Sequence, residues 1–96
     1  MARTVTGEQR VRMAPNVSTS ELHGELVLLN FATESYYGLD AIGARMVAVL
    51  TAEPSVDRAV EVLLGEYDVD AERLRADVDR LLAKLVAGGL VELVAG

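Results

Sequence analysis

The chain has 96 residues, about half of them apolar, and a formal net charge of −6. This length suits one domain around a single core and leaves no room for a second. The acidic balance disfavours a general phosphate-binding role, because affinity for nucleic acid comes largely from positive charge that releases counterions. The absence of cysteine excludes disulfides, thiolate nucleophiles and cysteine-based zinc sites.

The N-terminal segment is polar and carries three arginines before Met13, without the apolar stretch of a secretory signal. We expect residues 1–9 to form a flexible tail and residues 10–95 to form the folded domain. No apolar run approaches the roughly 18 residues that a membrane-spanning helix needs. The sequence therefore predicts a cytoplasmic protein with no membrane partner.

The first half of the chain is expected to form strands. Residues around Val11 and Val17 alternate loosely, and Pro15 limits this first strand to a sheet edge or a bulge. An almost continuous apolar run follows at residues 26–31, and residues 36–39 have the aromatic character of a hairpin's return strand. The sequence thus predicts three N-terminal antiparallel strands.

After these strands, the apolar spacing becomes helical. Asp40, Ser55 and Asp70 are the expected N-caps of three helices. The first helix should end before Pro54, and the Gly88-Gly89 pair should end the third. Each helix has apolar residues three and four apart: Ile42, Met46, Val49 and Leu50, then Val56, Ala59, Val60, Leu63 and Leu64, then Leu74, Val78, Leu81, Leu82 and Leu85.

A short apolar segment at residues 90–94 closes the chain. It is too short to stand alone, so we expect it to pair with the earlier hairpin as a terminal strand. The order of strands, three helices and a last strand predicts an α+β fold. This order is compatible with a winged helix-turn-helix built on the second and third helices.

Few residues could carry catalysis or bind a metal. His23 is the one histidine, lies next to Gly24 in an expected turn, and has no second nitrogen or sulfur ligand elsewhere in the chain. Asp68, Asp70 and Glu72 alternate as in a calcium loop, but the glycine and the glutamate that such a loop needs are missing. The sequence predicts no catalytic residue, no metal and no cofactor, and hence no enzyme.

A DNA-binding regulator that places the third helix in a major groove is one alternative. Arginines on this helix could contact phosphate, but acidic residues alternate with them, so the helix face is nearly neutral. The arginines are Arg73, Arg75 and Arg80. A nucleic-acid partner is therefore not expected.

The apolar stripe of the third helix is wider than one small sheet requires. It spans more than about 140° at about 100° per residue. Part of the stripe could line a groove whose opposite wall is the strand at residues 36–39.

Short motifs follow one another in a fixed order between Val11 and Val94. They are Leu28-Leu29-Asn30, Tyr36-Tyr37-Gly38-Leu39-Asp40, Gly43, residues 46–50, Glu66-Tyr67-Asp68-Val69-Asp70, Asp77-Val78 and Gly89-Leu90. This ordered set resembles the leader-recognition domains of pathways for ribosomally made, post-translationally modified peptides, which are related to the PqqD-like peptide chaperones. Two positions depart from the pattern. Val47 stands where the family often has an aromatic residue. Glu34 stands where the family often has glycine, so the hairpin of this chain would need another type of turn.

The resemblance implies a winged helix-turn-helix that takes up the leader of a precursor peptide as an antiparallel strand beside the third strand, toward the third helix. Small stand-alone members of this kind are similar to the leader-binding subunit of lasso-peptide biosynthesis. Their partners would be a separate leader peptidase and an ATP-dependent cyclase. Within the family, the alternative is a PqqD-type chaperone that serves a radical enzyme.

Main-chain hydrogen bonds alone would give weak peptide binding. An added strand makes roughly four to six of them at about 0.5–1.5 kcal/mol each, and ordering the peptide costs about 2–5 kcal/mol. A micromolar complex therefore needs buried leader side chains as well. We predict that the edge is formed by Ser35, Tyr36, Tyr37, Gly38 and Leu39, that the pocket is formed in part by Leu74, Val78 and Leu81, and that a basic leader residue meets Asp77.

Overall fold

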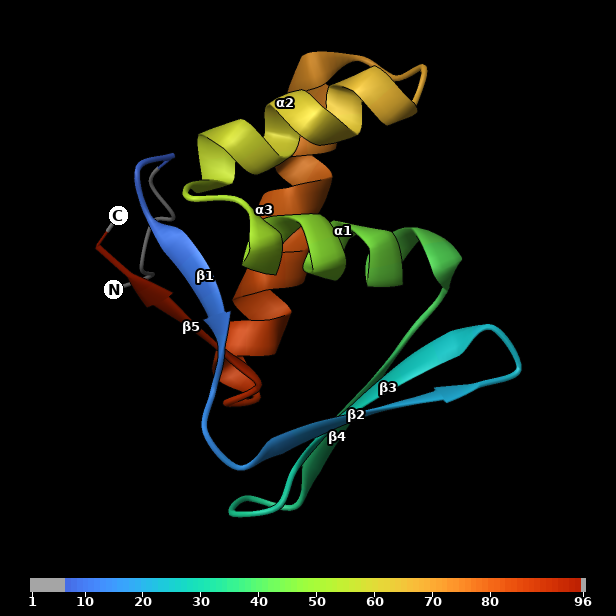
Figure 1. Ribbon diagram of the computed structural model, residues 1–96, viewed down its shortest axis with the longest axis vertical. Helices are drawn as coiled ribbons and strands as arrows, with labels where there is room; N and C mark the ends of the chain where they lie inside the picture. The colour runs from blue at the N-terminus through green and yellow to red at the C-terminus, as the bar shows by residue number, and fades with distance from the viewer. Residues whose placement is uncertain (1–6, 96) are drawn as a thin grey trace.

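The computed structural model describes residues 7–95 (Figure 1). Its elements follow one another as β1 (Arg10–Met13), β2 (Val17–Leu22), β3 (Glu25–Asn30), β4 (Ser35–Leu39), α1 (Ala41–Ala52), α2 (Val56–Glu66), α3 (Ala71–Ala87) and β5 (Val91–Val94). The predicted α+β class, with three helices and antiparallel strands, is confirmed.

Strands β2, β3 and β4 form an antiparallel sheet in that order. His23 and Gly24 join β2 to β3 as a two-residue turn. Both have positive φ angles, 52° and 82°, as a type I′ hairpin turn requires. The turn between β3 and β4 contains Glu34, whose φ of 58° lies in the left-handed region that glycine favours. The predicted hairpin of residues 26–39 is confirmed.

The closing strand does not join this hairpin, and that prediction is wrong. Strand β5 pairs antiparallel with β1 in a separate two-stranded sheet, with Val94 opposite Arg10 and Val91 opposite Met13. The prediction of three N-terminal strands is also wrong, because a turn at Pro15-Asn16 divides the expected first strand into β1 and β2. In the described part of the chain, four strands thus precede α1.

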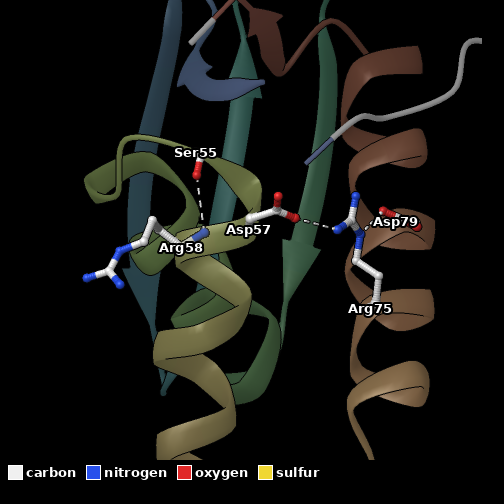
Figure 2. Close-up of polar contacts among 5 residues, drawn as sticks. All are labelled: Ser55, Asp57, Arg58, Arg75 and Asp79. Atoms are coloured by element: carbon white, nitrogen blue, oxygen red, sulfur yellow. Dashed lines mark hydrogen bonds and ion pairs between the residues drawn. The ribbon is translucent and has the colours of Figure 1, made fainter. Parts of the chain in front are cut away.

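Two predicted helix caps make the side-chain bonds expected of them. Asp40 Oδ1 accepts a hydrogen bond from the Gly43 amide at 2.8 Å, and Ser55 Oγ accepts one from the Arg58 amide at 3.2 Å (Figure 2). Asp70 is the N-cap of α3, but its side chain makes no cap hydrogen bond. The predicted helix starts are therefore confirmed, although the third lacks the predicted bond.

The ends of α1 and α3 also lie where the sequence places them. Helix α1 ends at Ala52, two residues before Pro54. Helix α3 ends at the Gly88-Gly89 pair, where Gly89 has a φ of 69°. The Leu90 amide then donates to the Leu85 carbonyl at 2.9 Å, which turns the chain directly into β5.

One core joins both sheets and all three helices. Helix α1 contacts β1, β3, β4 and α2, while α3 contacts α2 and β5. Figure 1 shows the β2–β3–β4 sheet below α1 and the β1–β5 pair beside α3. Ile42 departs from the predicted buried stripe of α1, with 53% of its surface exposed. The largest fully buried side chains are Leu28, Leu50, Leu63, Leu82, Leu85, Leu90, Val11, Val56 and Val78.

The segment before β1 contacts the start of α2. The Gly7 carbonyl accepts a hydrogen bond from the Asp57 amide at 3.0 Å, and the Gln9 carbonyl accepts one from the Val56 amide at 2.8 Å. These bonds satisfy two amides that a helix N-terminus otherwise leaves unpaired. The rest of the predicted tail, residues 1–6, lies outside the described residues. Within residues 7–95, no helix has both the length and the apolar composition needed to cross a bilayer.

Candidate peptide-binding site

Strand β4 is an outer strand of its sheet. Strand β3 pairs with one side of it, and no other strand of the described range 7–95 pairs with the opposite side. An outer strand presents unpaired N–H and C=O groups that can pair with an added strand. The stretch from Ser35 to Leu39 therefore has the open edge that peptide addition requires.

The side chains of β4 alternate between two faces. Leu39 is 4% exposed and contributes to the core, and Tyr37 is half-buried against it. Tyr36 is 75% exposed, and Gly38 is exposed too. Because successive side chains of a strand point to opposite faces, Tyr37 and Leu39 face the helices and Tyr36 faces away from them.

A hollow of about 410 Å³ lies where β4 meets α1 and α3. We call it the β4 hollow. Met46 of α1 and Leu81 of α3 form part of its apolar wall. The complete lining is Glu25, Tyr37, Gly38, Leu39, Asp40, Gly43, Met46 and Leu81.

A second hollow, of about 510 Å³, lies between α1, α3 and the loop that precedes α3. We call it the α3 hollow. Its lining is Ile42, Met46, Tyr67, Asp68, Val69, Asp70, Arg73, Leu74 and Asp77. Because Met46 lines both hollows, they adjoin at its side chain. Each volume lies in the range of roughly 300–1,000 Å³ that is usual for ligand sites.

The predicted residues of α3 divide between these hollows and the core. Leu81 lines the β4 hollow, and Leu74 and Asp77 line the α3 hollow. Val78 is fully buried and lines neither hollow, so its predicted role in the pocket stays a prediction. At 100° per residue, Asp77 and Leu81 lie toward one flank of the apolar stripe, whereas Val78 lies near its middle, which faces the core.

Glycine at position 43 allows α1 to start close to the end of β4. A Cβ atom there would lie 3.1 Å from Leu39 Cδ2 and 3.4 Å from Asp40 Oδ1. The first distance is tighter than most Cβ contacts, so the Leu39 side chain would have to shift by a few tenths of an ångström to admit a larger residue. Gly43 therefore helps to define the floor of the β4 hollow, which it also lines.

The rims of the two hollows are acidic. Glu25 and Asp40 line the first, while Asp68, Asp70 and Asp77 line the second together with a single arginine, Arg73. Asp77 is not free, because Arg80 Nη1 lies 3.2 Å from its Oδ1. A basic residue of a bound peptide would therefore compete with Arg80 for Asp77.

A second arginine of α3, Arg75, is also engaged in ion pairs. Arg75 Nη1 lies 3.1 Å from Asp57 Oδ1, and Arg75 Nε lies 3.0 Å from Asp79 Oδ1 (Figure 2). These contacts connect the start of α2 to the middle of α3. Together with the Asp77–Arg80 pair, they neutralise two of the four cationic side chains that α3 would present to DNA.

One further ion pair connects α1 to α2, outside both hollows. Arg45 Nε donates to Glu66 Oε1 at 2.8 Å, and Arg45 Nη2 donates to Glu66 Oε2 at 2.5 Å. The hydrogen bond from Arg45 lowers the pKa of Glu66 below its ordinary value, and the same bond raises the pKa of Arg45. This two-bonded pair contributes to the arrangement of the helices rather than to the hollows.

Several residues of the hollows were not predicted as site residues. Ile42 and Met46 were expected only to contribute to the core, and Tyr67 and Val69 belonged to a motif without an assigned role. Ile42 is 53% exposed and Val69 is 46% exposed, so both present apolar surface at the α3 hollow. Periodicity alone cannot identify them, because it does not show which side of a helix lacks a covering element. Within residues 7–95, no three possible metal-ligand side chains come together.

Comparisons with known proteins agree with this architecture. Residues 25–91 match the PqqD family, described as coenzyme PQQ synthesis protein D. The solved structure of TbiB1 in complex with the TbiA(beta) leader peptide is 30% identical, with a TM-score of 0.76 over 84% of this chain and 94% of that chain.

A second solved structure, of lasso peptide synthetase B1 complexed with the leader peptide, is 24% identical and shares the fold. Its TM-score is 0.77 over 86% of this chain and 98% of that chain. No curated protein sequence matches significantly. Because the family match covers well over half of the sequence, this chain belongs to the PqqD family.

Proposed function

We propose that this chain binds the leader of a ribosomally made precursor peptide by strand addition to β4. It would deliver the leader to a separate leader peptidase and a cyclase in lasso-peptide biosynthesis. The observation that carries the proposal is the open edge of β4 beside the β4 hollow. TbiB1, which is 30% identical over most of its length, was solved with a leader peptide, and this supports the same role here.

The leader is proposed to run antiparallel to β4. All strand pairs within residues 7–95 are antiparallel, and antiparallel pairs are about two to three times as common as parallel ones in proteins. In this orientation, the amino-terminal part of the leader lies near Leu39, and its carboxyl-terminal part leaves near Ser35. Alternate leader side chains would then point toward the helices.

Apolar leader residues would supply most of the affinity. One such residue enters the β4 hollow against Met46 and Leu81, and a residue further toward the leader's amino terminus reaches the α3 hollow near Ile42. Burying each stabilises the complex by roughly 1.5–3 kcal/mol, which raises weak strand pairing to micromolar affinity. The acidic rims favour a leader with a basic residue close to Asp77.

In this proposal, the chain acts by binding and has no catalytic step or cofactor of its own. Leaders are made on ribosomes, so we place the activity in the cytoplasm. Helices α2 and α3, joined by a short loop, support describing the fold as a winged helix-turn-helix. A PqqD-type chaperone that serves a radical enzyme would use the same edge. It differs only in the enzyme that receives the peptide.

A DNA-binding regulator is the competing function from another class. The ion pairs of Arg75 and Arg80 argue against it, as does the net charge of −6. A gel-shift experiment at low salt separates the two. We expect no shift with duplex DNA, whereas a specific, salt-dependent shift would favour the regulator.

The binding site is tested with a fluorescein-labelled leader from the precursor peptide of the same gene cluster. Leu81→Asp places a charge in the β4 hollow, and we expect it to weaken binding at least about tenfold. Leu64→Asp is the matched control, because Leu64 is also a half-buried helical leucine but lines neither hollow. Circular dichroism confirms that both variants fold. No binding by the wild type, or equal binding by the Leu81→Asp variant, would refute the proposal.

A further inference from the structure

We infer that Asn30 is a positioning residue for leader binding. The space between β4 and α3 contains the β4 hollow, and we call this space the leader groove. Through its hydrogen bond to Gly89, Asn30 holds the end of α3 at the distance from β4 that the leader needs. The inference rests on the proposed leader binding to β4, and it assigns a role to a residue that lines neither hollow.

Helix α3 forms one wall of the leader groove but has its main contacts elsewhere. It packs mainly on α2 and β5, whereas α1 is the helix that packs on β3 and β4. Leu81 of α3 lines the β4 hollow together with Tyr37 and Leu39 of β4. The width of the groove therefore depends on the connections that hold α3 to the sheet at either end.

Asn30 makes this connection at the Ser35 end of β4. It lies directly opposite Ser35 in the β3–β4 ladder. Its Nδ2 donates to the carbonyl oxygen of Gly89 at 2.7 Å, and Gly89 directly follows the C-cap of α3. Figure 1 shows the end of α3 on the same side of the molecule as the β3–β4 turn. At the Leu39 end, Met46 of α1 lies between the sheet and α3 instead, because it lines both hollows.

The side chain of Asn30 has one defined orientation. It is 6% exposed, and its Oδ1 accepts hydrogen bonds from the amides of Ala32 and Thr33 at 2.8 and 3.2 Å. The two amides must face the oxygen and the Gly89 carbonyl must face the nitrogen, so a flipped side chain would lose all three bonds. Asn30 therefore sets one distance between the β3–β4 turn and α3.

Glycine at position 89 allows this close approach. Its φ of 69° lies in the left-handed region, which glycine adopts without steric cost. A Cβ atom there would also lie 3.3 Å from Asn30 Nδ2, which is tighter than most Cβ contacts. The Asn30–Gly89 contact thus depends on the residue types at both of its ends.

The leader needs a groove of defined width. An added strand lies about 4.8 Å from its neighbour, so its inward side chains contact Leu81 only when α3 stays close to β4. When the groove has the right width in only a fraction of the molecules, the apparent affinity falls by that fraction. Asn30 therefore contributes to affinity by preorganising the groove before the leader arrives.

The test compares three variants of the full chain with the wild type. Asn30→Asp keeps an oxygen for the two turn amides but replaces the donor to Gly89 with an acceptor. Gly89→Asn changes the same contact from the other side, because asparagine tolerates a left-handed φ while its Cβ crowds Asn30. Val56→Ala is the matched control, since Val56 is fully buried in the core but lines neither hollow. Urea denaturation measures the stability of each variant.

Two measurements are made under conditions in which each variant is folded. Fluorescence polarisation with the labelled synthetic leader gives the affinity. Because the chain has no cysteine, nitroxide labels can be attached specifically through Ala32→Cys in the turn and Lys84→Cys on α3, both at exposed positions. Double electron–electron resonance then gives the distribution of distances between the turn and α3, with and without leader. A purely structural role of Asn30 would change neither quantity in the folded protein.

We expect Asn30→Asp to weaken leader binding about tenfold, which corresponds to the right groove width in about one tenth of the molecules. Its distance distribution should be broader than that of the wild type, and leader should narrow it. Gly89→Asn should weaken binding at least about twofold with a similar broadening, and it decides the question alone when Asn30→Asp does not fold. Val56→Ala should keep the wild-type affinity and distribution.

Wild-type affinity or an unchanged distance distribution in the folded Asn30→Asp and Gly89→Asn variants would overturn this inference and leave leader binding intact. A loss of affinity of the same size in Val56→Ala would also overturn it, because the loss would then follow stability alone. Absence of leader binding by the wild type would instead refute the proposed function.

Discussion

Asn30 Nδ2 donates a hydrogen bond of 2.7 Å to the carbonyl oxygen of Gly89, 59 residues away in the chain. Asn30 is only 6% exposed, and its Oδ1 accepts from the amides of Ala32 and Thr33. One side chain thus joins the β3–β4 turn to the end of α3. Strand β3, which pairs with β4, is thereby connected to the end of the helix that contributes Leu81 to the β4 hollow.

We predict that Asn30→Ala destabilises the fold by about 2–4 kcal/mol, since each buried polar group left without a partner costs about 1–3 kcal/mol. Urea denaturation measures the change. Thr33→Ala is the control, because Thr33 is exposed and its Oγ1 accepts only one exposed bond, from the Ser35 amide. A similar loss in both variants would show that the Gly89 bond has no special importance.

Glycine at position 34 should stabilise the protein by up to about 1 kcal/mol. Glu34 has a φ of 58°, and the left-handed conformation costs a residue with a Cβ about 1–2 kcal/mol, partly offset by the greater flexibility of unfolded glycine. Thermal denaturation compares the melting temperature of the Glu34→Gly variant, which relieves the left-handed strain, with that of the Glu34→Ala variant, which does not. Only the glycine variant should melt at a higher temperature, and a gain of equal size in the alanine variant would contradict this explanation.

The Arg45–Glu66 pair should make stability depend on pH at the acidic end. The lowered pKa of Glu66 means that, below the ordinary value of about 4.3, the unfolded state binds more protons than the folded state. Stability from this pair is therefore present above that pH and is lost as the pH falls through the lowered pKa. Glu66→Gln should reduce stability at pH 7 and have little effect at pH 3. An equal effect at both pH values, by urea denaturation at low salt, would exclude this role.

Replacing Arg80 should strengthen the binding of a leader that carries a basic residue. Arg80→Gln releases Asp77 from its 3.2 Å ion pair. We expect affinity to rise by about twofold to fivefold, the size of an exposed ion pair, and Asp77→Asn to remove this gain. Fluorescence polarisation at low and high salt checks both variants. Weaker binding by Arg80→Gln would indicate that Arg80, rather than Asp77, contacts the leader.

Local signals in the sequence predict most of the elements. The N-caps Asp40 and Ser55, the Gly88-Gly89 helix end and the β3–β4 hairpin each depend on a few neighbouring residues, and the structure contains all of them. The pairing of β1 with β5 depends on two four-residue strands about 80 positions apart. Neither has a local feature that specifies its partner, and the closing strand was therefore placed in the wrong sheet.

The site was harder to predict than the fold. The open edge of β4 follows from its position as the last strand of a hairpin, and no other strand within residues 7–95 pairs with that edge, whereas its role in binding stays a prediction. The apolar stripe of α3 gave no sign of which flank borders the hollows, because both flanks are apolar, with Leu81 on one and Val86 on the other. Only the position of α1 shows which flank borders the hollows, because Met46 of α1 lines both of them.

Hydrogen–deuterium exchange of the full chain, with and without the synthetic leader, tests the leader site most directly. We predict that leader binding protects amides of β4, from Ser35 to Leu39, and leaves the other outer strand of the sheet, β2, unchanged. Protection of β2 with no change in β4 would place the leader on the wrong edge and contradict the account.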